Sequence, residues 1–131
     1  MELLLVISIL AVLISVFFFN SDSFRRAQLM RYGLNDTLAF IRESREQAIA
    51  ESTGISLQFF ENIVMIKKDL DAKKTPSFKL LAGGLKAKEQ VTIGFNSAGH
   101  PIQAGTITLI DQKGTEKHIA IAVGTGRVRS Y

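Results

Sequence analysis

An uncharged apolar run near the start of the chain limits what the chain can fold into. Leu3 to Phe19 are seventeen residues without a charge, and only Ser8 and Ser15 are polar. A helix over this run would be roughly 25 Å long. A typical membrane span needs ~20 apolar residues, so this run is slightly short. A helix that is apolar on every side needs lipid or a large core. Because 131 residues supply one modest core, a membrane helix fits best.

The residues on either side of this run bear on two questions: whether it is a secretory signal peptide, and on which side of the membrane the rest of the chain lies. A signal peptide has a basic start and a small-residue cleavage site, whereas only Met1-Glu2 precede this run and FFFNSDS follows it. Arg25, Arg26 and Arg31 lie after the run and nothing basic lies before it. The positive-inside rule then places the C-terminal part in the cytoplasm, unless a basic leader is missing from the sequence.

Helical periodicity resumes after Asn20-Ser21-Asp22-Ser23. Apolar residues then recur mostly at three- and four-residue steps, which predicts an amphipathic helix from about Phe24 to Glu51. They are Ala27, Met30, Leu34, Leu38, Ile41 and Ala48. Asp22 and Ser23 would cap a new helix, or the first helix runs through. Gly54 is the expected C-terminal cap, and no proline interrupts residues 1–53, so one long helix is the simplest interpretation.

Beyond Gly54 the pattern becomes β-rich and predicts an antiparallel meander with hairpin loops. The expected strands are Ile55 to Phe60, Asn62 to Lys67, Gln90 to Phe95, Gly105 to Ile110, Lys117 to Val123 and a last short strand in RVRSY. The segment KKDLDAKKTPSFK is expected to be a polar loop. The order of elements predicts an α+β protein, with one long N-terminal helix packed on an antiparallel β-sheet domain.

Residues for catalysis are not apparent in the sequence. The chain has no cysteine, which excludes disulfides, thiolate metal sites and cysteine nucleophiles. Phosphate-binding loops, zinc-protease motifs and serine nucleophile elbows are also missing. His100 lies in a turn and His118 at a strand start, and both are expected to be surface residues. We therefore expect a protein that is not an enzyme, with no cofactor and no metal.

Two basic features are candidates for binding anions, given 16 Lys and Arg against 12 Asp and Glu. One is the weaker patch, Lys67, Lys68, Lys73 and Lys74, which is better explained as a solvated loop that keeps strand edges from aggregating. The other is the terminal VGTGRVRSY, where Arg127 and Arg129 would project from one strand face. One arginine guanidinium can donate two parallel hydrogen bonds to two oxygens of a phosphate. A glycine turn followed by a polar edge strand also explains the pattern.

The N-terminal segment MELLLVISILAVLIS resembles that of mature type IV pilins and type II secretion pseudopilins. Met1-Glu2 matches the last two positions of the family's hallmark, in which Gly-Phe-Thr-Leu precedes an aliphatic residue or Met and then Glu. The later segments GFNSAGHPIQAGTITLI and HIAIAVGTGRVR resemble the GspH/FimT branch. The resemblance covers almost the whole chain and implies a type IV pilin-like fold.

The resemblance also implies how such a protein would work. Family members sit in the inner membrane with the globular domain outward, periplasmic or extracellular. Prepilin peptidase cleaves them and methylates the new N-terminus, and subunits then join a filament through their apolar helices. Glu2 matches the glutamate that pairs with an N-terminal ammonium. The basic leader and Gly-Phe-Thr-Leu are missing here, so we expect a clipped start with four or more residues upstream.

Some FimT-branch members bind DNA for natural transformation through a C-terminal Gly-Arg-x-Arg motif. Gly126-Arg127-Val128-Arg129 matches this motif, so the resemblance makes Gly126, Arg127 and Arg129 candidate DNA-binding residues. The alternative is a GspH-like pseudopilin that contacts tip partners or exported protein and binds no DNA. In either case the expected organisation is a membrane or filament-core helix over 1–20, an amphipathic helix half over 21–53 and an antiparallel β domain over 54–131.

Overall fold

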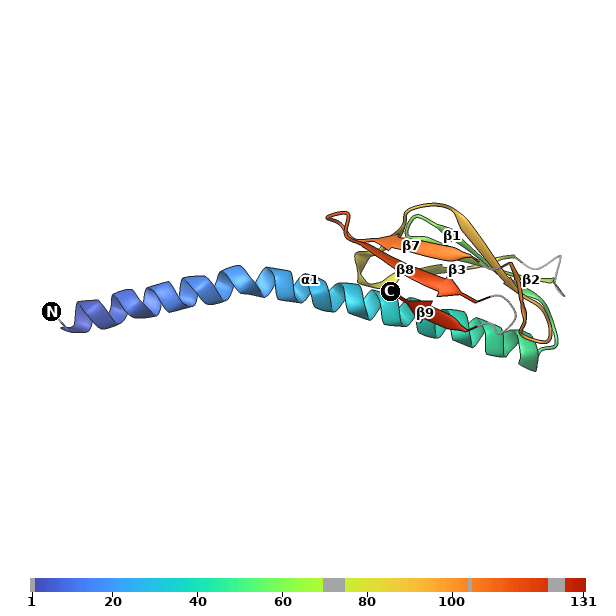
Figure 1. Ribbon diagram of the computed structural model, residues 1–131, viewed down its shortest axis with the longest axis horizontal. Coiled ribbons are helices and arrows are strands. Elements are labelled where there is room, and N and C mark those ends of the chain that lie inside the picture. The colour runs from blue at the N-terminus through green and yellow to red at the C-terminus, as the bar shows by residue number, and fades with distance from the viewer. Residues whose placement is uncertain (1, 70–74, 104, 123–126) are drawn as a thin grey trace.

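The computed structural model describes residues 2–69, 75–103, 105–122 and 127–131, with the side chains of 19 and 20 left aside. One α-helix, α1 (Glu2–Ala50), opens this part of the chain. The strands follow it and cover its C-terminal half, so the N-terminal half extends away from the domain (Figure 1). This is the expected α+β class, and its long N-terminal helix packed on antiparallel sheets is consistent with a type IV pilin-like fold.

The helix α1 runs through the polar segment 20–23 without a break. Its apolar half is solvent-exposed, from 51% at Leu10 to 79% at Phe17, and an 18-residue window there has a mean hydropathy of 2.8. The hydroxyls of Ser8 and Ser15 donate to the carbonyls of Leu5 and Val12. Because these hydroxyls are paired within the helix, the segment needs no water for them and suits an apolar environment.

The second half of α1 buries the predicted stripe. Met30, Leu34, Leu38, Ile41 and Ala48 are buried, as the periodicity predicted. The prediction was wrong for Ala27, which is exposed because it lines an open cleft between α1 and the β domain rather than the core. These side chains join residues of the strands in a single core, which includes Leu57, Phe59, Phe95, Ile107 and Ile119.

The C-terminal end of α1 is a Schellman motif centred on Ser52. The amide of Ser52 donates to the carbonyl of Ile49 (3.2 Å) and that of Thr53 to the carbonyl of Ala48 (3.0 Å). Ser52 has φ 50°, the left-handed conformation that closes such a motif. The prediction of Gly54 as the cap was therefore wrong, because the chain turns two residues earlier and Gly54 leads directly into the first strand.

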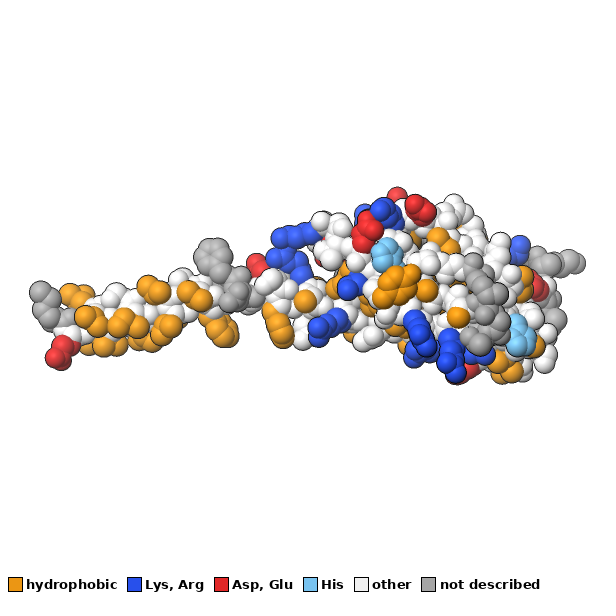
Figure 2. Space-filling view, viewed as in Figure 1, with side chains coloured by type: hydrophobic (Ala, Val, Ile, Leu, Met, Phe, Trp, Pro, Cys, Tyr) orange, Lys and Arg blue, Asp and Glu red, His pale blue; other side chains and the backbone are white. Residues whose placement is uncertain are grey.

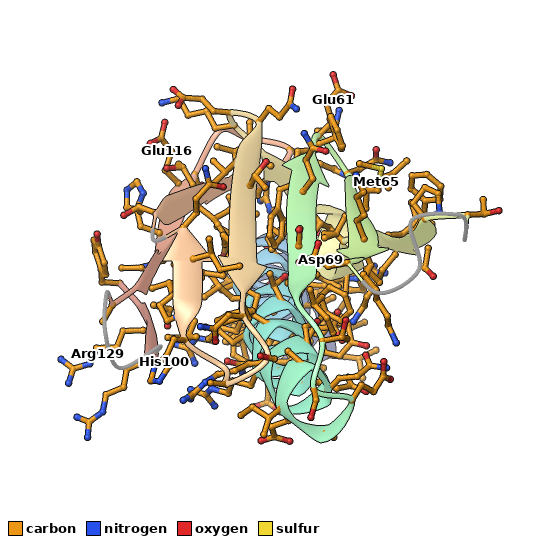
Figure 3. All side chains as sticks on the ribbon, turned by 90° about the vertical axis from the view of Figure 1, so that its right-hand side faces the viewer. Glu61, Met65, Asp69, His100, Glu116 and Arg129 are labelled. Atoms are coloured by element: carbon orange, nitrogen blue, oxygen red, sulfur yellow. The ribbon has the colours of Figure 1, made fainter. Side chains whose placement is uncertain are left out.

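The described strands form two antiparallel sheets rather than the single meander that the sequence predicted. One sheet has the order β3-β2-β1-β5-β6 and the other β4-β7-β8-β9. The first sheet contains β1 (Ile55–Phe60), β2 (Ile63–Lys68), β3 (Ser77–Leu80), β5 (Val91–Phe95) and β6 (Pro101–Gln103). The second contains β4 (Lys86–Ala87), β7 (Thr106–Ile110), β8 (Glu116–Ile121) and β9 (Val128–Ser130). Seen along α1, they arch over the helix (Figure 3).

The departure from a meander has a local cause, since β1 is the central strand of its sheet. It pairs with β2 on one side, with Leu57 opposite Ile66, and with β5 on the other, with Leu57 opposite Ile93. Its side chains alternate between buried and half-buried, which suits a strand covered on one face. The edge strands β3 and β6 were not predicted as strands. Most of β3 lies in the segment predicted as a polar loop, and β6 directly follows the turn that contains His100.

A short 3₁₀ turn, η2 (Ala82–Gly84), packs against the middle of α1 at Gly33. A Cβ added at Gly33 would lie 2.4 Å from the carbonyl oxygen of Ala82 and 2.7 Å from Cδ1 of Leu85. The sequence marked Gly33 only as a weak point in the helix. In the structure it lets a connecting segment approach the helix backbone, and so helps to place the sheets on α1.

Candidate functional site

Two of the three predicted DNA-binding residues flank the start of β9. Arg127 directly precedes this strand and Arg129 lies within it, opposite Ala120 of β8. Both arginines are exposed, while Val128 between them is buried against the core. Gly126, the third residue of the motif, lies outside the described residues. The strand thus turns its apolar side inward and leaves both guanidinium groups free to meet a ligand.

The last turns of α1 bring two further arginines to the same place. Because β9 packs on α1, Arg42 and Arg45 line one cleft with Arg127 and Arg129. The cleft has a volume of about 480 Å³, and its described lining is Arg42, Arg45, Glu46, Ile49, Arg127, Val128 and Arg129. We call it the arginine cleft. Figure 3 shows Arg129 and His100 on the same side of the domain.

The position of Arg45 is fixed by the turn between β5 and β6. Its Nε donates to the carbonyl oxygen of Gly99 at 2.9 Å. The turn itself is held by Asn96, whose Oδ1 accepts from the amides of Ala98 and His100. Gly99 has φ +75°, and a Cβ there would lie 2.6 Å from Cδ1 of Ile49. Only glycine meets both requirements, so this turn holds one guanidinium at the cleft wall.

The charges of the arginine cleft favour an anion. Among its described lining residues, four guanidinium groups face one carboxylate, Glu46. Arginine stays protonated at any physiological pH, and its planar fork matches phosphate oxygens in pairs. The walls come from a helix and a strand, which are rigid supports. The arrangement can therefore bind an extended polyanion by its phosphates, whereas no chemical step is apparent among these residues.

Sequence reasoning missed Arg42 and Arg45 as site residues. Their three-residue spacing places them on one side of a helix, but it gives no information about which strand would lie alongside. Arg127 and Arg129, by contrast, were predicted from their two-residue spacing on a strand and from their match to a short motif. The contact between α1 and β9 links residues more than eighty positions apart, and only the tertiary structure reveals it.

The weaker lysine patch does not form one surface of unpaired charges. Nζ of Lys68 lies 2.7 Å from Oε2 of Glu51, in a salt bridge that joins β2 to the end of α1. Lys67 is exposed on β2, and Lys73 and Lys74 lie outside the described residues. The nearby Lys79 pairs with Asp36 at 3.1 Å and lies over the ring of Phe40. Lys68 and Lys79 therefore stabilise the contact between the first sheet and α1.

Three other residues singled out in the sequence, Glu2, His100 and His118, do not line the arginine cleft. Glu2 is the first described residue of α1 and is exposed, and its pairing with an amine stays a prediction. His100 is exposed in the β5–β6 turn. His118 lies within β8, where its Nδ1 is 3.1 Å from Oγ1 of Thr108 and its ring lies beside Tyr131. No metal-binding group of three His, Asp or Glu occurs in the described part of the chain.

Comparisons with known proteins found no match for this chain. No family model matches it, and neither does any curated protein or any solved structure.

Proposed function

We propose that this protein is a minor pilin or pseudopilin, a non-catalytic subunit of a type IV pilus or type II secretion pseudopilus. The single observation that carries the proposal is the division of α1 into two halves. One half is apolar and exposed, and the other is packed on a β domain without a break between them. Such a helix anchors a subunit in a bilayer first and can join a bundle of like helices afterwards.

The exposed half of α1 requires a cover in both situations. Moving its large side chains out of water lowers the free energy by about 25 cal/mol per Å² of apolar surface. Lipid supplies the cover in the membrane, and neighbouring helices supply it in a filament. Glu2 is the exception, because a carboxylate inside a bilayer costs ~2.5–3.5 kcal/mol on insertion scales. In the proposed assembly, a terminal amine of another subunit compensates this cost.

The anchor is tested by removing the apolar half of the helix. We expect the full chain to float with lipid vesicles in a density gradient, while residues 21–131 stay in the soluble fraction. The fragment keeps the core residues of α1 and all strands, so its circular dichroism should show a cooperative thermal transition. An unfolded fragment, or one that still floats with vesicles, would contradict the division of the helix.

The role in assembly is tested by changing Glu2 to Leu in the natural gene. Leucine removes the charge that needs a partner, so we expect the variant to remain in the membrane fraction. Its amount in filaments sheared from cells should fall at least about tenfold, which corresponds to roughly 1.4 kcal/mol of lost pairing. Glu2→Asp keeps the charge and serves as the control. Equal incorporation of the Leu variant would remove Glu2 from the assembly contact.

DNA capture is a second proposed function, and the arginine cleft favours it. Four arginines from two elements converge on one open cleft, which is more cationic than the two-residue motif alone. The chemistry suits the phosphate backbone and supplies no reading of base sequence. A GspH-like pseudopilin that contacts tip partners or exported protein would instead bind no DNA. The salt dependence of DNA affinity separates the two.

A further inference from the structure

A second cationic cleft lies at the end of the domain nearest the apolar half of α1. Arg26 and Arg31 of α1, Lys113 of the turn between β7 and β8, and Lys117 of β8 line a cleft of about 500 Å³. We call it the β7–β8 basic cleft. The β7–β8 connection reaches along α1 toward its N-terminus (Figure 1), and Lys and Arg side chains gather where the bare helix meets the domain (Figure 2).

The β7–β8 turn is held in shape by Asp111, the carboxylate among the described residues of this cleft. Its Oδ1 accepts hydrogen bonds from the amides of Lys113 at 2.9 Å and Thr115 at 2.8 Å. The hydrogen bond from the Thr115 amide is the main cause that lowers the pKa of Asp111, and the charge of Arg26 lowers it further. The carboxylate thus stays ionised and shapes the turn, while four cationic side chains line the same cleft.

The position of this cleft along α1 brings it close to a membrane surface. Arg26 follows Phe19 by seven residues, which is about 10 Å along the helix. The headgroup layer on each side of a bilayer is roughly 5–8 Å thick. An arginine just outside this layer can extend its long side chain back toward the headgroups. The charge of anionic lipids, where a leaflet contains them, acts over a further ~8 Å at physiological salt. The arginine cleft, by contrast, lies about 28 Å further along α1 at Arg45.

We propose that the β7–β8 basic cleft binds the phosphate groups of anionic phospholipids in the membrane that holds α1. The inference rests on the proposed membrane anchor and goes beyond it. Because Lys113 lies in the β7–β8 turn, Lys117 in β8 and Arg26 in the helix, one lipid surface contacts both the second sheet's hairpin and α1. This contact holds the domain down on the bilayer and sets the angle between the domain and the membrane, while the arginine cleft stays directed away from it.

The test measures how close the β7–β8 turn lies to lipid headgroups. The chain has no cysteine, so Gln112→Cys gives a single fluorescent label at the exposed tip of the turn. The full chain is reconstituted in phosphatidylcholine vesicles, with and without phosphatidylglycerol, and a headgroup nitroxide quenches the label. We expect at least about twofold stronger quenching with phosphatidylglycerol, and a return to the phosphatidylcholine level in high salt.

Two matched variants and a second label complete the experiment. Arg26→Gln/Lys113→Gln/Lys117→Gln should remove the effect of phosphatidylglycerol, whereas Arg127→Gln/Arg129→Gln should preserve it. A label at Ser97→Cys, in the β5–β6 turn, should respond equally to both lipids. Equal quenching of the Gln112→Cys label in both lipids, or an unchanged effect in the triple variant, would overturn the proposal. Flotation of the full chain is scored separately, so a missing anchor is distinguished from a missing headgroup contact.

Discussion

Replacing Arg127 and Arg129 with alanine should flatten the salt dependence of duplex DNA binding by up to about two units of slope. Each phosphate that a protein neutralises contributes about −0.9 to the slope of log K against log salt concentration. Extending the change to Arg42 and Arg45 should remove up to about 3.6 units in total, because all four line one cleft. The measurement is fluorescence anisotropy of labelled DNA with residues 21–131 at several salt concentrations.

Matched controls separate this site from general attraction to a basic domain. Lys67→Ala/Lys86→Ala removes the same charge from exposed positions on β2 and β4, and should leave the slope unchanged. Arg127→Lys/Arg129→Lys keeps the charge but loses the paired hydrogen bonds of guanidinium, so the slope should persist while affinity falls. If the double alanine variant kept the wild-type slope, Arg127 and Arg129 would not belong to a DNA site. An equal loss of slope in Lys67→Ala/Lys86→Ala would show that DNA is attracted by the overall charge of the domain rather than by a site.

Changing Gly33 to Ala should destabilise the domain, although alanine is the better helix former. Helix propensity alone predicts a gain of about 1 kcal/mol. The new Cβ would, however, lie 2.4 Å from the carbonyl oxygen of Ala82, a backbone atom that no side-chain rotation can move. Overpacking of this kind costs about 1–3 kcal/mol. The cost exceeds the gain, so we expect the free energy of unfolding of residues 21–131 to fall by up to about 2 kcal/mol in urea titrations.

Asn35→Ala provides the control for helix propensity at a nearby position. Asn35 is exposed on α1, so its replacement should raise the free energy of unfolding by a few tenths of a kcal/mol. The two substitutions then shift stability in opposite directions in the same helix. A Gly33→Ala variant more stable than the wild type would mean that η2 does not press on α1 at this point.

The strands show where the sequence was informative and where it was not. The regular alternation in β1 and the β-rich run in β7 predicted these strands within a residue or two. Pairing was harder to predict, because β1 bonds to β5 across more than thirty intervening residues as well as to its neighbour β2. Such a pairing leaves no local pattern. The edge strand β3 was missed for another reason: its alternation covers only four residues and follows Pro76 and a lysine-rich segment, so the sequence predicted a loop there.

The candidate site divides in the same way. Arg127 and Arg129 were predicted from a short motif near the end of the chain, and both are exposed at the cleft. Arg42 and Arg45 lie off the apolar stripe of the helix, and no sequence pattern predicted a role for them. Their part in the site depends on β9 lying across α1 and on the Gly99 carbonyl that holds Arg45. A motif identifies residues that are adjacent in sequence, but a cleft is formed by elements that meet in space.

The sequence by itself determined the long helix and its two halves. The uncharged apolar run favours a helix, because a helix satisfies its backbone hydrogen bonds internally. The three-to-four periodicity that follows places a single apolar stripe on the side of the helix that faces a core. The tertiary structure decided the division into two sheets, the close contact at Gly33, and the positions of the two cationic clefts along α1. These depend on packing between distant segments, and packing depends on the shapes that meet rather than on any local pattern of residues.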